Sequence, residues 1–168
     1  MTTEYYKPIR ILQFFWYGVT LAAVPMIAVA VGLGTLFEAL PEAVYVVDVP
    51  QLAAWAIVLG LMGIGVMAGK LAGQKFLTPA QMARRSVQGQ PKSVQDGAEM
   101  RVKQAMFIQL SLYETPAILL IGYTLMAAEP QWVIAGAIYM VAVGVLAKPQ
   151  FLNLLQDTQR ELERLGTW

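Results

Sequence analysis

The sequence contains no cysteine and no histidine. Without cysteine the chain cannot form disulfides or use thiolate chemistry, and without histidine it lacks the usual ligands of haem and zinc. The same absences exclude Ser-His and Cys-His catalysis. Any chemistry must therefore come from carboxylates, lysines, tyrosines or hydroxyl groups, and we expect no metal and no cofactor.

Charge is also scarce. Only 14% of the 168 residues are charged and 57% are hydrophobic, whereas a soluble domain carries about 25% charged residues. The net charge of +1 gives no reason to expect a nucleic-acid partner. The composition predicts an all-α integral membrane protein with a single membrane domain in contact with the lipid bilayer.

Apolar runs divide the chain, and we interpret them as four transmembrane helices arranged as two tandem helical hairpins. The runs cover residues 11–36, 51–73, 104–128 and 132–147. The expected organisation is a first hairpin at about 11–73, a polar loop at 74–103, a second hairpin at about 104–147 and an amphipathic helix at 149–166.

The loops differ in charge. Residues 74–103 carry six basic residues, namely Lys75, Arg84, Arg85, Lys92, Arg101 and Lys103, whereas residues 37–50 carry three acidic residues and no lysine or arginine. Because positively charged loops stay in the cytoplasm, we expect 74–103 and both termini to be cytoplasmic. Segment 149–166 then contacts either a partner or the chain's own middle loop.

The two hairpins share an internal repeat. QFFWYGVTLAAVP (13–25) aligns with QAMFIQLSLYETP (104–116), and IGVMA (64–68) aligns with VGVLA (143–147). In this alignment Ala23 occupies the position of Glu114. The sequence therefore indicates two tandem copies of one unit, of which the second carries the carboxylate.

The second apolar run is rich in glycine, with Gly60, Gly63, Gly65, Gly69 and Gly73. Small residues allow transmembrane helices to approach closely. Two interpretations are open: these glycines pack two helices within one molecule, or they form an inner layer where many copies meet.

Glu114 is the acidic residue of the third apolar run and lies ten residues after Gln104. At 1.5 Å per residue this places it roughly 15 Å into the helix, near the middle of a hydrocarbon layer about 30 Å thick. An ionisable group there is costly and indicates a functional site. The alternative is a protonated glutamate that is hydrogen-bonded to a neighbouring helix.

Three polar residues surround Glu114 in the sequence. Ser111 lies on the same helical face, where its hydroxyl can reach the carboxyl group. Tyr113 and Thr115 flank the acid and are candidate supporting residues. Each has a simpler alternative, because Thr115 can bond back to the Ser111 carbonyl and Tyr113 can serve in packing.

The order of these motifs resembles the proteolipid c subunit of rotary ATPases. The glycine helix ends in GIGVMAGK (63–70), a polar loop with ARR (83–85) and Gln90-Pro91 follows, and LYETPAIL (112–119) carries the acid. The resemblance implies an inner glycine helix, an outer helix with Glu114 as the ion-carrying carboxylate, and a loop that faces a catalytic head. The residues of this loop that would contact the head are then Arg84, Arg85, Gln90 and Pro91.

The resemblance implies a proton carrier rather than a catalyst: the ion-translocating subunit of a proton-coupled ATPase or ATP synthase, in a bacterial inner or organellar energy-coupling membrane. Sodium-binding members carry a glutamine at the position of Ile64, which cannot coordinate a cation. Expected partners are further copies in a ring and a stator-type subunit bearing an arginine. The alternative is a c-like scaffold or accessory subunit of a larger membrane complex without rotor activity.

Overall fold

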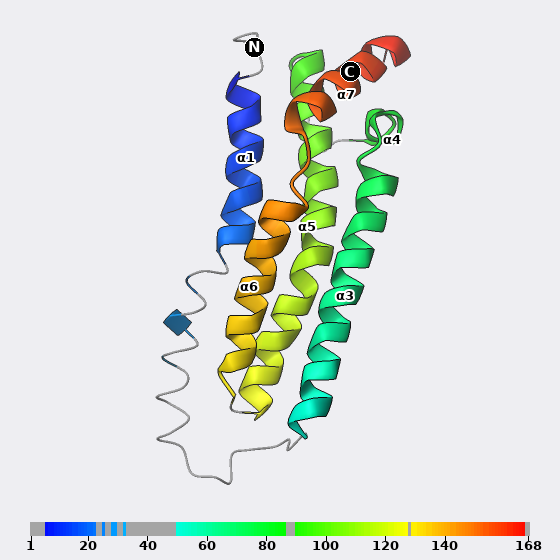
Figure 1. Cartoon of the computed structure of the whole chain (residues 1–168). Coiled ribbons are helices and arrows are strands. Elements are labelled where there is room, and N and C mark those ends of the chain that lie inside the picture. The colour runs from blue at the N-terminus through cyan, green and yellow to red at the C-terminus, as the bar shows by residue number, and fades with distance from the viewer. Residues whose placement is uncertain are drawn as a thin grey trace.

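The computed structural model describes residues 6–22, 25, 28–29, 32, 50–86, 90–127 and 129–166. All regular secondary structure in these ranges is helical, which confirms the all-α prediction (Figure 1). The helices are α1 (Tyr6–Leu21), α3 (Gln51–Phe76), α4 (Pro79–Ala83), α5 (Val94–Ala127), α6 (Gln131–Leu146) and α7 (Phe151–Leu165).

Helix α5 is the centre of the molecule. Helix α3 packs along one side of α5, while α6 and α1 pack on the other side, and α1 contacts both of them (Figure 1). At one end of the bundle, α4 and α7 pack against each other and against α5. Each of the other described helices therefore contacts α5.

Helix α3 docks on α5 through a glycine face, which consists of Gly65, Gly69 and Gly73 at intervals of four residues. A Cβ atom at Gly69 would overlap a ring, and one at Gly73 would lie 2.6 Å from an amide nitrogen. The α5 side chains that occupy these three positions are Pro116, Tyr113 and Gln109, respectively. The glycines thus serve close packing between two helices of one molecule.

Of the predicted first hairpin, the structure describes helices α1 and α3 but not most of the segment between them, so the hairpin stays a prediction. Helices α1 and α3 lie on opposite sides of α5 and α6 (Figure 1). The physical reason is shape: the glycine face of α3 fits the bulky side chains of α5, and α1 instead contacts α6 at Gly144, where a Cβ atom would lie 2.6 Å from Thr20 Oγ1.

Two helices, α3 and α5, are long and apolar enough to cross a membrane. Helix α6 meets the criterion only when joined to α7, which is bent from it by 60°. The second part of the predicted span 11–36, including Ala23, lies partly outside the described residues, since 23–24, 26–27, 30–31 and 33–36 are not described. Length and composition thus allow two spans, or three if the bent pair is one span, within the part of the chain that the structure describes.

Helix α7 is the amphipathic segment expected at 149–166. It buries Phe151, Leu155, Thr158 and Leu162 against the bundle, and Leu162 packs with Ala83 of α4 and Ala98 of α5. Its apolar face therefore contacts the chain's own middle region. That region is shorter than the expected loop 74–103, because α3 continues to Phe76 and α5 already begins at Val94.

Candidate functional site

Glu114 lines a small pocket between three helices, which we call the Glu114 pocket. The pocket has a volume of about 200 Å³. Apart from Glu114 its lining is apolar: Val19 of α1 and Ala22 just after that helix, Ala117, Ile118 and Ile121 of α5, and Met140 of α6. Glu114 itself is half-buried. The carboxyl group therefore has hydrocarbon neighbours from every helix that borders it.

No hydrogen bond or ion pair joins Glu114 to another described residue, and no basic side chain lines its pocket. The expected hydrogen bond from Ser111 is absent, because the Ser111 hydroxyl donates to the Phe107 carbonyl at 2.9 Å. Thr115 donates to the Ser111 carbonyl at 2.8 Å. Both hydroxyl groups thus bond to the backbone of their own helix, and neither one satisfies the acid.

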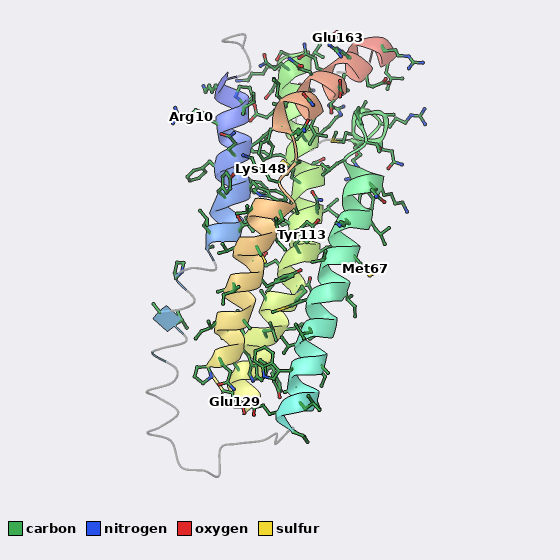
Figure 2. The ribbon with its side chains drawn as sticks, viewed as in Figure 1. Arg10, Met67, Tyr113, Glu129, Lys148 and Glu163 are labelled. Atoms are coloured by element: carbon green, nitrogen blue, oxygen red, sulfur yellow. The ribbon has the colours of Figure 1, made fainter. Side chains whose placement is uncertain are left out.

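Tyr113 has a different location from Glu114. Its ring is buried against Gly69 on the side of α5 that faces α3. Figure 2 shows Tyr113 within the bundle, whereas Met67 points outward from α3. Tyr113 therefore holds α3 in place, and it does not belong to the Glu114 pocket.

Helix α1 completes the Glu114 pocket, and a buried hydrogen bond to α6 fixes its position. Trp16 Nε1 donates to the Gly144 carbonyl of α6 at 2.9 Å. One turn further on, the Thr20 hydroxyl donates to the Trp16 carbonyl at 3.0 Å and its side chain packs on Gly144. These contacts hold Val19 next to the acid. Sequence reasoning noted Trp16 and Thr20 only as repeat positions.

The predicted loop residues lie around the ends of α4 and α5. Arg84 is exposed at the end of α4, and the Arg85 guanidinium lies 4.7 Å from the centre of the Phe76 ring. Arg101, which sequence reasoning did not single out, is buried and donates from Nε to the Arg85 carbonyl at 3.1 Å. Gln90 is exposed, and Pro91 is half-buried beside Gly97.

The remaining predicted glycines, Gly60 and Gly63, have open space beside them, since no atom lies within 4 Å of the place that a Cβ would occupy. Within the described ranges, no group of three or more acidic residues is placed to hold a metal ion. Among the predicted site residues, we therefore take Glu114 and its apolar pocket as the candidate functional site. Comparison of the chain with protein-family models, curated proteins and solved structures finds no match.

Proposed function

We propose that this chain is a multi-pass integral membrane protein in which Glu114 binds and releases a proton, in the manner of the rotary ATPase c subunit that its sequence resembles. The observation that carries the proposal is the isolation of Glu114. Its carboxyl group lies twenty residues into α5, in a pocket of hydrocarbon side chains, without a bonding partner among the described residues.

An ionised carboxylate in such surroundings is costly unless an opposite charge or a hydrogen-bond donor reaches it. The protonated acid is neutral, so its burial costs much less. Because the structure supplies no partner from the described residues, the charged form requires one from outside, such as an arginine of another subunit. Proton release at Glu114 would then be coupled to the approach of that partner, which is the property an ion carrier needs.

A second candidate is a c-like scaffold or accessory subunit. The glycine face favours it, because Gly65, Gly69 and Gly73 are filled by side chains of the chain's own α5. Glycines used in this way are not available to pack many copies into an inner ring. Only Gly60 and Gly63, among the glycines of α3 named above, have open space beside them.

The test of the carrier is chemical labelling together with proton flux. The chain in its native membranes, where its partner subunits are present, is treated with a hydrophobic carbodiimide, which reacts with protonated carboxyl groups in lipid. We expect label on Glu114, and we expect Glu114→Gln to lose both the label and proton transfer. Glu129→Gln is the matched control, since Glu129 lies at the end of the span and accepts a hydrogen bond from Trp132 Nε1 at 2.6 Å. Unchanged flux in Glu114→Gln would reject the carrier.

Native mass spectrometry in mild detergent separates the carrier ring from the scaffold. A closed ring predicts a homo-oligomer of many copies. A single copy bound to other proteins supports the scaffold and overturns the ring, even where Glu114 still takes the label.

A further inference from the structure

A second and larger cavity lies on the other side of α5. It has a volume of about 790 Å³ and is bordered by α3, α5 and α6, with α7 at one end. It shares no residue with the Glu114 pocket. We call it the α3–α6 cavity, and its size falls within the range of about 300–1,000 Å³ that is typical of small-molecule sites.

Two residues that line this cavity each hold a buried polar atom without a hydrogen-bond partner in the structure, namely Gln109 Oε1 and the Tyr139 hydroxyl. Their side chains are only 6% and 7% exposed, respectively. Gln109 Nε2 donates to the Gly69 carbonyl at 3.2 Å, which fixes the amide so that Oε1 is the free acceptor. Buried polar groups without partners are costly, so each indicates a missing group.

The other lining residues indicate what kind of ligand could pair with these two polar atoms. Apolar residues such as Val66, Val143 and Leu146 form the walls. Lys70 and Asp157 also line the cavity, and these two side chains carry opposite charges. Because the charges balance, the cavity does not select an anion or a cation. A neutral, largely apolar ligand fits such a lining.

We propose that the α3–α6 cavity binds a membrane-soluble amphiphile that carries a hydroxyl group on an apolar body. Gln109 Oε1 can only accept a hydrogen bond, so the ligand must donate one. The Tyr139 hydroxyl can donate or accept, so it can pair with an oxygen of the same ligand. A plain hydrocarbon leaves both atoms unpaired. Two sources share this chemistry: a phenolic ring such as that of a quinol, and an aliphatic lipid alcohol.

The experiment uses the full chain in lipid nanodiscs and matched pairs of ligands. A diazirine-bearing octylphenol labels the protein on illumination, and peptide mass spectrometry locates the label. Unlabelled 4-octylphenol and 4-octylanisole then compete; they differ in one O–H donor. Decanol and its methyl ether form the aliphatic pair. We expect label on Val66, Tyr139 or Val143, and we expect a hydroxylated competitor to be about tenfold more effective than its methyl ether. The pair with the larger difference between the hydroxylated compound and its ether shows whether the ligand is phenolic or aliphatic.

Variants test the two polar atoms. Gln109→Leu should remove the preference for the hydroxyl over the ether, and Tyr139→Phe should weaken the hydroxylated ligand about fivefold to tenfold. Tyr123→Phe, outside the cavity, is the control and should change nothing. Because Gln109→Leu loses the bond to Gly69, thermal unfolding is measured beside it, and the isosteric Tyr139→Phe carries the test if Gln109→Leu does not fold.

Three outcomes would overturn the proposal. The alcohol and its ether compete equally, the label appears only on the outer lipid-facing surface, or both Gln109→Leu and Tyr139→Phe still prefer the alcohol over the ether as strongly as the parent chain does. Equal competition would mean that water, and not the ligand, pairs with the two polar atoms. Label only on the outer surface would mean that the probe merely partitions into lipid. Glu114→Gln should leave the labelling unchanged, so this proposal and proton binding at Glu114 can fail independently.

Discussion

The two sides of α5 are built differently. Towards α3, the bulky side chains of α5 fill the glycine face, and a Cβ at Gly65 or Gly69 would overlap them. Towards α1, a pocket of about 200 Å³ remains around Glu114, and the neighbouring helix is held by one long-range hydrogen bond from Trp16 to Gly144. Close packing and a candidate reactive group thus lie on separate faces of one helix, so that substitutions can affect one without the other.

The largest effect is expected where the packed face is broken. Gly69→Leu places a side chain where the Tyr113 ring lies, and neither helix backbone can yield without separating α3 from α5. Overpacking typically costs about 1–3 kcal/mol and occasionally more, and we expect the upper end or a failure to fold. Thermal unfolding in detergent measures the loss.

Gly60→Leu is the matched control for Gly69→Leu. It makes the same substitution in the same helix, but no atom lies within 4 Å of a Cβ at this position. The midpoint of its thermal unfolding should stay close to that of the parent chain. Equal destabilisation by both substitutions would show that helix propensity, and not the fit to Tyr113, accounts for the loss.

A smaller effect is expected where α1 meets α6. Trp16→Phe keeps an aromatic ring but leaves the buried Gly144 carbonyl without its donor, which costs about 1–3 kcal/mol. Loosening α1 should also make Glu114 more reactive towards a hydrophobic carbodiimide, because Val19 and Ala22 cover it. Labelling rate and unfolding midpoint are measured together.

Trp55→Phe controls for the loss of an indole. Trp55 is 42% exposed and packs edge-on against Trp132, which lies at the opposite end of α6 from Gly144. Trp55→Phe should change the labelling rate of Glu114 and the midpoint of thermal unfolding much less than Trp16→Phe does. A Trp16→Phe variant that labels at the parent rate would contradict the role of α1 as the cover of the Glu114 pocket.

Much of the fold follows from sequence periodicity. Apolar length predicts α3 and α5, and helical spacing predicts α7. The pairing of helices does not follow, because adjacency in sequence suggests a hairpin of α1 and α3. The actual partner of α3 depends on a three-dimensional fit between the glycine face and side chains that are distant in sequence, such as Tyr113 at Gly69.

The candidate site shows the same division. The composition of the third apolar run identifies Glu114 as an unusual residue. Its pocket, however, needs Val19 from α1, Ala22 just after it and Met140 from α6, and no local pattern brings these together. Gln109 and Tyr139 gave no sequence signal, since a lone polar residue in an apolar helix becomes informative only when its unpaired atom is known to be buried.

The smallest effect is expected for Glu114→Gln, and it tests the alternative that this residue is structural. The substitution keeps the shape and has no bonding partner to lose among the described residues, so the change should stay within about 0.5 kcal/mol. Glu129→Gln, by contrast, weakens the bond from Trp132 Nε1 at 2.6 Å and should cost about 1 kcal/mol. If Glu114→Gln lowers the free energy of unfolding as much as Glu129→Gln does, then Glu114 is a structural hydrogen-bonding residue, and the two faces of α5 both serve packing.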